Sequence, residues 1–420
     1  MSGAITIDGA RLLGRIQALG RIGRDPAGRL CRVALSDADK AGRDALAGWM
    51  AAAGMTVAVD AIGNLFGLWG DRPGGGPDPV MIGSHIDTVV DGGIYDGNYG
   101  VLAGLELVET LRDAGVAAAR PIVVAAFTNE EGVRYVPDMM GSLVHAGGLA
   151  LADALSCRGS DGTTVGAELA RIGYAGSLAP GTIRPHAYVE LHIEQGPLLE
   201  HEGLRIGAVE NLQGISWQRI ALRGQANHAG TTPMRLRRDA GHAAARIVTF
   251  LHDLAEGSGG TTVATVGSLR LQPDVINVIP SRAQLTVDLR DTDDGRLATA
   301  EAALARFLAT LAAETGVAIE AERLSRFAPV TFDARLVELI EDAARRHGLP
   351  SRRMTSGAGH DAQMMARICP AAMIFVPSAG GISHNPREHT DEADLVAGAN
   401  VLLDVVRRLG DADGPLLGWT

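Results

Sequence analysis

The sequence predicts an α/β protein built on a mixed β-sheet and interrupted by a smaller inserted α+β domain. Three observations lead to this prediction. Apolar, strand-like runs alternate with helical patterns over the first half of the chain, as in α/β layer structures. From about residue 210 the order becomes β-α-β-β-α-β, which is typical of a small ferredoxin-like domain with helices on one sheet face. His384 lies beyond this segment but matches the polar residues that follow the early strands, so the chain must return to the first domain. We therefore expect a discontinuous main domain over residues 1–209 and 327–420 and an inserted domain over residues 210–326.

The first elements of the main domain follow local start and stop signals. An amphipathic pattern over residues 7–22 predicts a helix that packs on the rest of the domain. Ser36, which acidic residues follow in the sequence, predicts the N-terminus of a second helix, and Gly54 ends that helix. Short strands are expected at residues 56–59 and 65–68.

Four predicted strands end beside side chains that can bind a metal. Each is a short apolar run; the runs cover residues 80–83, 121–127, 187–191 and 371–376. The residues that follow them include His85 and Asp87, Glu130 and Glu131, His192 and Glu194, and His384. In open α/β sheets, binding sites form outside the carboxyl ends of the strands. A turn would explain one polar strand end, but the repetition favours a common site.

The first strand end shows how such a site would be built. Residues two apart in an extended chain point to the same side, so Asp87 can hold the ring of His85, as metal-bound histidines commonly require. A glycine-rich turn then brings Asp96 to the start of a helical pattern over residues 100–111. Imidazoles and carboxylates together suit zinc or a similar divalent ion. Their number is sufficient for two metals that share a carboxylate.

The inserted domain and the return to the main domain are predicted from periodicity. Strands are expected at residues 214–222, 262–271, 283–289 and 317–322, and helices at residues 239–254 and 294–315. Helices at residues 332–347 and 393–409 would then return the chain to the main domain.

Composition excludes several classes of protein. The chain has 420 residues, of which 46% are hydrophobic and 21% charged, as is ordinary for an enzyme of two or three domains. Its net charge of −11 disfavours nucleic acid and anionic membranes as partners. No apolar run approaches the roughly 18 residues of a membrane span. Three widely spaced cysteines (Cys31, Cys157 and Cys369) and an N-terminus without signal-like features lead us to expect buried, reduced thiols in a cytoplasmic protein.

The chain resembles the M20-type metallopeptidase superfamily, and within it the hydantoinase/carbamoylase branch of amidases. The motifs that carry the resemblance are HIDTVVDGGIYDGNYGVLAGLE, TNEEGVRY, ELHIEQGP, GQANHAGTTPM, NVIPSRAQLTVDLRD, SGAGHDA and GISHNPRE, in order along nearly the whole chain. The strongest marker is His192, because peptidase members usually have a carboxylate there. The TTPM that follows His228 is also typical of the amidase branch.

The resemblance implies two divalent metal ions per subunit, zinc or else manganese, cobalt or nickel. The implied ligands are His85, Asp96 and His192 for one ion, and Asp96, Glu131 and His384 for the other, with Asp96 bridging. Glu130 would act as the general base on a water between the metals, and Asp87 would orient His85. The implied activity is hydrolysis of the carbamoyl C–N bond of an N-carbamoyl-L-amino acid to the amino acid, carbon dioxide and ammonia.

The resemblance also implies a small ureido or carbamoyl carboxylate as substrate and a homodimer formed through the inserted lid/dimerisation domain. The implied substrate-binding residues are Gln195, His228, Asn277, Arg290 and the backbone near Gly359. His228 would donate to the oxyanion and is expected to reach the active site of the partner subunit. Arg290 would grip the substrate carboxylate, but Asp288 shares its strand face, so an internal Arg–Asp pair is the alternative.

Several alternatives stay open at this point. Within the same chemistry these are allantoate or ureidoglycolate amidohydrolase and β-ureidopropionase, and more distantly a dipeptidase or aminoacylase, which His192 disfavours. A non-catalytic binding protein would lack at least one ligand, and none is missing. A serine hydrolase is unsupported because no G-x-S-x-G motif occurs. The roles of Arg134, Glu194, His360 and His389 are undecided, and six histidines without a partner pattern, His145 among them, are expected at the surface or at helix caps.

Overall fold

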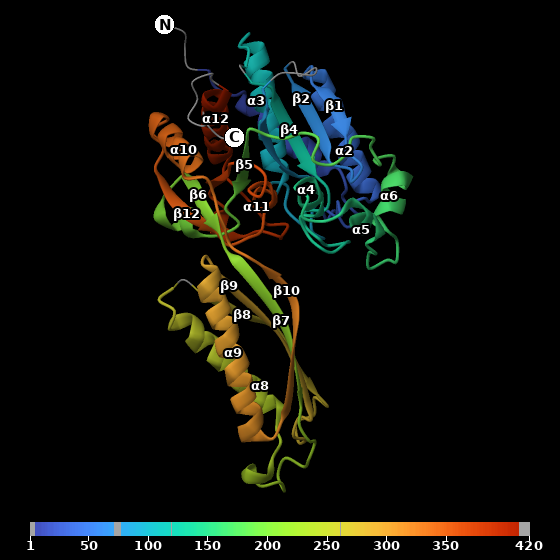
Figure 1. Cartoon of the computed structure of the whole chain (residues 1–420), viewed down its shortest axis with the longest axis vertical. Coiled ribbons are helices and arrows are strands. Elements are labelled where there is room, and N and C mark those ends of the chain that lie inside the picture. Colours follow the sequence, from blue (N-terminus) through green and yellow to red (C-terminus); the bar gives the residue numbers. More distant parts are fainter. Residues whose placement is uncertain (1–4, 71–76, 119, 261, 411–420) are drawn as a thin grey trace. The chain divides into compact units, whose positions relative to one another are not determined.

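The computed structural model describes residues 5–70, 77–118, 120–260 and 262–410 (Figure 1). The chain divides into two compact units, one formed by Met1–Glu210 with Phe332–Thr420 and the other by Asn211–Thr331. The fold class predicted from the sequence, a mixed-sheet α/β domain with an α+β insertion, is confirmed.

A nine-stranded mixed sheet forms the centre of the first unit, in the order β1-β2-β4-β3-β5-β13-β6-β11, with β12 paired to β6. The strands are β1 (Thr56–Val59), β2 (Leu65–Trp69), β3 (Val80–His85), β4 (Ile122–Phe127), β5 (Ala187–Ile193), β6 (Ile206–Leu212), β11 (Val330–Thr331), β12 (Ser351–Ser356) and β13 (Ala371–Val376). The central strands β4, β3, β5 and β13 are neighbours and run parallel. Their carboxyl ends therefore meet at one edge of the sheet, as the sequence predicted.

Helices cover this sheet. They are α1 (Gly9–Arg21), α2 (Asp37–Ala52), α3 (Asn98–Asp113), α4 (Met140–His145), α5 (Leu151–Ser156), α6 (Val165–Ile172), α7 (Leu198–Glu202), α10 (Ala334–Arg346), α11 (Asp361–Met365) and α12 (Glu392–Gly410). Helix α3 packs on β3, β4 and β5. A Cβ at Gly100 would lie 2.4 Å from the carbonyl oxygen of Leu191, so glycine is needed for this close approach. The tight packing fixes the N-terminus of α3 at the carboxyl ends of the strands.

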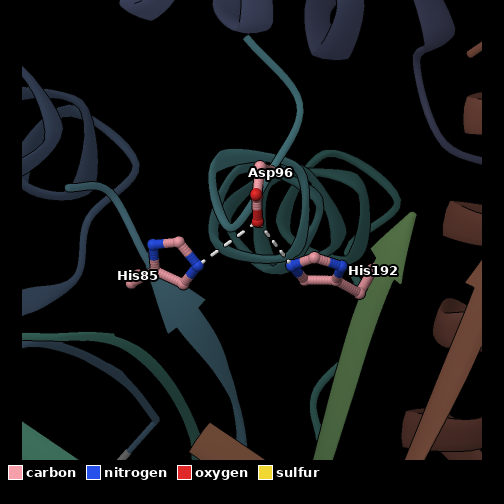
Figure 2. Close-up of side chains that lie close together, drawn as sticks. All are labelled: His85, Asp96 and His192. Carbon is pink, nitrogen blue, oxygen red and sulfur yellow. Dashed lines mark ion pairs between the residues drawn. The ribbon is translucent and has the colours of Figure 1, made fainter. Parts of the chain in front are cut away.

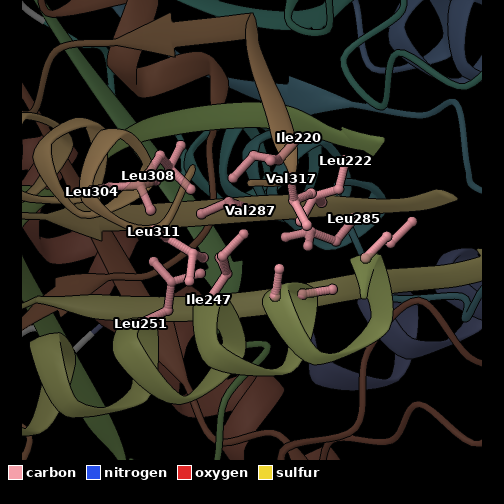
Figure 3. Close-up of a cluster of buried hydrophobic side chains, with 14 of the residues drawn as sticks. Ile220, Leu222, Ile247, Leu251, Leu285, Val287, Leu304, Leu308, Leu311 and Val317 are labelled. Atoms are coloured by element: carbon pink, nitrogen blue, oxygen red, sulfur yellow. The ribbon is translucent and has the colours of Figure 1, made fainter. Parts of the chain in front are cut away.

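The second unit is a four-stranded antiparallel sheet with two helices (Figure 1). Its elements are β7 (Gly214–Arg223), α8 (Ala240–Glu256), β8 (Val263–Gln272), β9 (Arg282–Asp291), α9 (Asp294–Thr315) and β10 (Ala318–Phe327), and the strand order is β10-β7-β9-β8. Figure 3 shows its core, where Ile247 and Leu251 of α8 and Leu304 and Leu308 of α9 face sheet residues such as Leu285. The apolar faces that periodicity predicts for the helices and strands thus pack together in one buried layer.

Some local predictions were incomplete. Strand β3 continues through His85, so this histidine is the last strand residue rather than the first loop residue. Strands β6 and β12 and the short helices α4 to α7 and α11 were not predicted. All three cysteines are free, and of these only Cys369 is fully buried. None of the helices in the described ranges is long and apolar enough to cross a membrane.

The core of the second unit gives a stability prediction with a built-in control. Leu285 is fully buried, whereas Leu269, its partner in the β8–β9 register, is 45% exposed. Leu285→Ala should destabilise this unit by about 2–5 kcal/mol through lost burial and a cavity, and Leu269→Ala by about 0.5 kcal/mol or less. Hydrogen exchange of the amides of β9 and α8 measures both changes. Equal effects of the two substitutions would contradict the assigned core.

Candidate metal centre

The carboxyl ends of β3 and β5 and the N-terminus of α3 bring three predicted ligands together. His85 ends β3, His192 lies near the end of β5, and Asp96 precedes α3. Figure 2 shows the Asp96 carboxylate between the two imidazoles. One oxygen, Oδ1, lies 3.1 Å from His192 Nε2 and 3.5 Å from His85 Nε2. All three side chains are nearly inaccessible to solvent.

Backbone carbonyls orient the rings of His85 and His192 through their Nδ1 atoms. His85 Nδ1 lies 2.9 Å from the backbone carbonyl of Asp87, and His192 Nδ1 lies 2.8 Å from that of Ile193. A carbonyl only accepts hydrogen bonds, so each Nδ1 donates a proton there and each ring turns Nε2 toward Asp96. Burial lowers the pKa of both rings, but the surrounding carboxylates, Glu130 first for His85 and Asp96 first for His192, outweigh burial and raise both pKa values. Two Nε2 atoms and a carboxylate oxygen thus converge on one buried point. These donors fit a divalent cation, which would replace the protons that must otherwise separate them.

A second group forms on the other oxygen of Asp96. His384 Nε2 lies 3.2 Å from Asp96 Oδ2 and 3.5 Å from Glu131 Oε2. The His384 side chain is 53% exposed, unlike the inner pair of imidazoles. The groups His85–Asp96–His192 and Asp96–Glu131–His384 each keep their ligand atoms within 4.8 Å of one another. Asp96 belongs to both groups, as expected of a bridging carboxylate.

The pKa values reflect this crowding of acceptors. Burial raises the pKa of Asp96, but its contacts with His192, His384 and His85 outweigh burial and hold the pKa well below the usual value. Contact with Asp96 raises the pKa of His384 to about 9. Burial, reinforced by Asp96, raises the pKa of Glu131 to about 8. The site therefore concentrates negative charge that a cation would stabilise.

Glu130 lies beside both groups. Its Oε2 is 3.4 Å from His85 Nε2, and its side chain is almost fully buried. Burial first, and then the charges of Asp361, Glu131 and Asp96, raise the pKa of Glu130 well above the usual value, against the opposing effect of His85. A buried carboxylate with a raised pKa is a suitable proton acceptor at the centre.

Asp87 acts on its neighbours differently from the sequence-based prediction. Its backbone carbonyl, and not its carboxylate, contacts the His85 ring; Asp87 Oδ1 is 4.0 Å from Nδ1. The carboxylate instead accepts the backbone N–H groups of Glu130 and Glu131, each at 3.3 Å. Asp87 thereby links the strand end that carries His85 to the loop that carries both glutamates.

Arg32 is a residue of the site that the sequence did not reveal. Its guanidinium is buried and donates to the carbonyls of Ile86, Leu19 and Ile22 at 2.7–2.8 Å, and to Asn98 Oδ1 at 2.7 Å. Ile86 follows His85 and Asn98 begins α3, so one side chain ties two ligand-bearing segments. Burial lowers the pKa of Arg32 to about 10, which leaves it charged at neutral pH. A lone arginine far from any motif gives no sequence signal for such a role.

Backbone geometry at the site is also constrained. Gly97 has a φ of +64°, and a Cβ there would lie 2.5 Å from the His85 ring. Asn129, Gln195 and His384 have positive φ although they are not glycine. Such conformations are uncommon and concentrate at functional sites.

Gln195 and Gly359 occupy different positions around the centre. Gln195 Nε2 donates to Asp96 Oδ2 at 2.9 Å, so this residue contacts a candidate ligand directly. Gly359 precedes His360, and a Cβ at Gly359 would lie 3.1 Å from the Met139 side chain. Gln195 therefore lies in the candidate metal centre, whereas the backbone at Gly359 packs closely against Met139.

His360 is buried beneath the centre, with its ring centroid 4.5 Å from that of His192. It forms a third group of possible ligands with Glu190 and His192. The carboxylate of Glu190 already accepts from Ser84 Oγ, Tyr188 Oη and the N–H of Ala362. Because its oxygens are satisfied, this group has no need of a cation, and His360 packs against His192 instead.

The other undecided residues have structural partners. Glu194 accepts the N–H groups of Leu198 and Leu199 and so caps α7. Arg134 forms ion pairs with Asp161 and Glu168. The remaining partners are Asp391 for His389, and the rings of Phe66 and Phe127 for His145. His145 was predicted at the surface or at a helix cap; it is the last residue of α4 but is buried, so a surface position is excluded.

The predicted substrate residues of the second unit do not lie together. His228 and Asn277 lie on two loops that an isolated antiparallel bridge between His228 and Val278 joins, and Ala229 N–H donates to the Asn277 carbonyl. The N–H groups of Gly230 and Thr231 donate to His228 Nδ1, so the proton of the neutral ring is on Nε2. These two loops lie beyond the Arg282 end of β9.

Arg290 lies at the opposite end of β9 from those two loops, roughly 27 Å from Arg282 at about 3.4 Å per residue. It donates to both carboxylate oxygens of Asp288, from Nη2 at 2.8 Å and from Nε at 3.1 Å. The internal Arg–Asp pair that the strand alternation suggested therefore forms. In one copy of the chain, His228 and Arg290 cannot bind the same small molecule.

The chain is similar to known proteins along nearly its whole length. Residues 81–408 match the model of peptidase family M20/M25/M40. The N-carbamoyl-L-amino acid amidohydrolase of Geobacillus stearothermophilus is 40% identical, covering 97% of this chain and 100% of the relative. The allantoate amidohydrolase of Escherichia coli is 37% identical over 91% of this chain and 94% of its own.

A solved structure shows the same fold along the chain. The hydantoinase/carbamoylase family amidase from Burkholderia multivorans superposes with a TM-score of 0.92 at 45% identity, covering 96% of this chain and 98% of that chain. Family membership and the clusters of histidine and carboxylate ligands together indicate that the chain binds a divalent metal. On its sequence and on its fold, the chain belongs to peptidase family M20/M25/M40.

Proposed function

We propose that this chain is a metal-dependent amidohydrolase that cleaves the carbamoyl C–N bond of N-carbamoyl-L-amino acids. Water and the ureido group would give the free amino acid, carbon dioxide and ammonia. The observation that carries the proposal is the pair of ligand groups that share Asp96 beside the buried Glu130. Relatives at about 40% identity over nearly the whole chain are named N-carbamoyl-L-amino acid amidohydrolases, which supports this substrate class.

The ligand set we propose is His85, Asp96 and His192 for one divalent ion, and Asp96, Glu131 and His384 for a second. When bound, such ions polarise a carbonyl oxygen and make water more acidic, which a poorly electrophilic ureido group requires. Zinc fits the imidazole and carboxylate donors, and manganese, cobalt or nickel are the other candidates.

The chain's own residues would then move the proton and hold the substrate. Glu130 takes a proton from the attacking water and delivers it to the leaving nitrogen. His228, with its proton on Nε2, donates to the oxygen that gains negative charge. Arg290 offers a planar fork to the substrate carboxylate, and Gln195, Asn277 and the backbone near Gly359 complete the proposed contacts.

A homodimer through the inserted domain would reconcile these roles. His228 and Arg290 lie at opposite ends of β9, so they serve one substrate only if they come from different copies. We propose that His228 of the partner subunit completes each active site. In a two-fold symmetric dimer both sites would be completed in the same way.

The alternative functions keep the same ligands and change the substrate. Allantoate amidohydrolases are among the relatives, so allantoate or ureidoglycolate hydrolysis is the second candidate, followed by β-ureidopropionase activity. A dipeptidase or aminoacylase is more distant, because His192 stands where peptidases usually have a carboxylate.

Ammonia release from a substrate panel tests the proposed function and its metal dependence. We expect turnover of N-carbamoyl-L-amino acids above that of N-carbamoyl-β-alanine, allantoate and ureidoglycolate, with D-enantiomers as controls. Removal of metal by a chelator should abolish activity, and Zn²⁺, Mn²⁺, Co²⁺ or Ni²⁺ should restore it. Full activity in a metal-stripped sample would refute the mechanism, and preference for allantoate would select the second candidate.

Mixing two inactive variants tests Glu130, His228 and the dimer together. Glu130→Gln should keep its metal but lose most turnover, and His228→Ala should lose about 10²–10³-fold as an oxyanion donor is removed. If His228 acts in the partner's site, each mixed dimer has one intact site, and random exchange should restore about a quarter of wild-type activity. Mixing without any recovery would show that both residues act within one subunit.

Arg290→Ala tests the carboxylate anchor. Loss of a charge-assisted contact worth about 1.5–3 kcal/mol should raise KM roughly tenfold or more for carboxylate substrates and leave metal content unchanged. Arg219→Ala is the matched control, because Arg219 pairs with the exposed Glu322 on the same sheet. Steady-state kinetics and metal analysis decide the question, and an unchanged KM would contradict the anchor role of Arg290.

A further inference from the structure

We propose that Glu388 is a positioning residue that sets the direction of a closed ring of hydrogen bonds around Asp96. Through this ring it turns the Gln195 amide so that Nε2 faces Asp96 and Oε1 is left to accept an N–H of the substrate. The metal and substrate roles of Asp96 and Gln195 rest on the proposed function. The orientation itself follows from the contacts described next.

Glu388 connects two ligand-bearing segments that are far apart in the chain. Its Oε1 accepts the backbone N–H groups of Tyr95 and Asp96, at 3.1 and 3.2 Å. Its Oε2 accepts the hydroxyl of Ser383, the residue before His384, at 2.8 Å. One carboxylate thus holds the backbone of Asp96 and the neighbour of His384.

The position of Glu388 is closely specified by its surroundings. The residue is 6% exposed, and a Cβ at Gly93 would lie 2.1 Å from its Oε1. Among the described residues, no arginine or lysine forms an ion pair with it. A buried carboxylate without a cationic partner is costly unless its hydrogen bonds are satisfied. Here three donors on two loops satisfy the carboxylate. Glu388 thereby restrains both loops at the metal centre.

Gln195 and Ser383 close the ring. Gln195 Nε2 donates to Asp96 Oδ2 at 2.9 Å and to Ser383 Oγ at 3.3 Å. Ser383 donates its single proton to Glu388, and Glu388 accepts from the N–H of Asp96. The path therefore leaves Asp96 at its backbone and returns to it at its carboxylate.

Glu388 determines which group donates and which accepts in each hydrogen bond of this closed ring. Because Glu388 takes the Ser383 proton, the Ser383 oxygen presents a lone pair to Gln195 and selects the NH₂ side of the amide. The opposite amide orientation would place an oxygen against a carboxylate oxygen of Asp96. Gln195 Oε1 then points away, and it is buried without a partner among the described residues. Such an orphan acceptor suits the N–H of a ureido or amide substrate.

Glu388→Gln tests this direction with almost no change in shape. A glutamine at this position would keep an oxygen for the two backbone N–H groups and donate its NH₂ to Ser383. Ser383 would then donate to Gln195 and turn its Oε1 against Asp96. We expect Zn²⁺ affinity, measured by chelator competition without substrate, to fall about 10–100-fold, as for other residues that orient metal ligands. KM should rise as well, because the acceptor in Gln195 is turned away.

Ser383→Ala distinguishes a directional role from a merely structural one. Removing the hydroxyl from the Glu388→Gln protein frees Gln195 to turn back to Asp96, so the double variant should bind Zn²⁺ more tightly than Glu388→Gln alone. Two independent structural losses would instead add. Ser383→Ala alone should lose less Zn²⁺ affinity than Glu388→Gln. It also tests the hydrogen-bond ring if the Glu388→Gln protein does not fold.

Glu200→Gln is the matched control, because the exposed Glu200 accepts the N–H of Gly380 outside the ring. It should leave Zn²⁺ affinity and KM unchanged. The proposal is overturned if Glu388→Gln behaves like Glu200→Gln, or if the losses of the double variant add. The Zn²⁺ ranking of the variants needs no substrate. If the wild-type protein hydrolysed no carbamoyl compound, the proposed function would be refuted. The Zn²⁺ affinities of the variants would still test the role of Glu388.

Discussion

The convergence of three imidazole nitrogens on the carboxylate of Asp96 is the constraint on which the site depends. Each Nε2 approaches within 3.5 Å, and backbone carbonyls hold two of the rings with Nε2 turned inward. Buried acceptors repel one another unless protons or cations lie between them. The surrounding fold therefore has to hold groups that need protons or a bound cation between them, and much of the local structure keeps these groups in place.

The groups that hold this arrangement are mostly backbone atoms and residues without chemistry of their own. Arg32 binds carbonyls at the end of α1 and at Ile86, Asp87 holds the N–H groups of the Glu130 loop, and Gly97 leaves room for the His85 ring. Each contact restrains a loop at the end of a strand, where the backbone has no sheet partners. Parallel strands bring the ligands to one edge, and these contacts set their final positions.

The sequence predicted the parts of the site that depend on local pattern. His85 and His192 follow apolar runs and could be located from strand periodicity alone. Glu388 could not, because its acceptor role depends on N–H groups 292 and 293 residues away, and no spacing rule covers such a distance. His145 was expected at the surface or at a helix cap because it lacks a partner motif, but burial against aromatic rings needs none. For Arg290, alternation offered the pair with Asp288 as the alternative, and this pair forms, whereas the favoured substrate role stays a prediction.

The place of β13 in the sheet has a consequence for how the protein is made. This strand lies between β5 and β6, although roughly 160 residues separate it from β6 and roughly 180 from β5 along the chain. While the ribosome is still synthesising the inserted segment, β5 has no neighbour on that side, and all seven of its residues are of the kind that end up buried. A strand edge left open in this way can pair with other chains. The edge of β5 is closed only after β13 has been synthesised, so the inserted segment prolongs the time for which the nascent chain is open to such pairing.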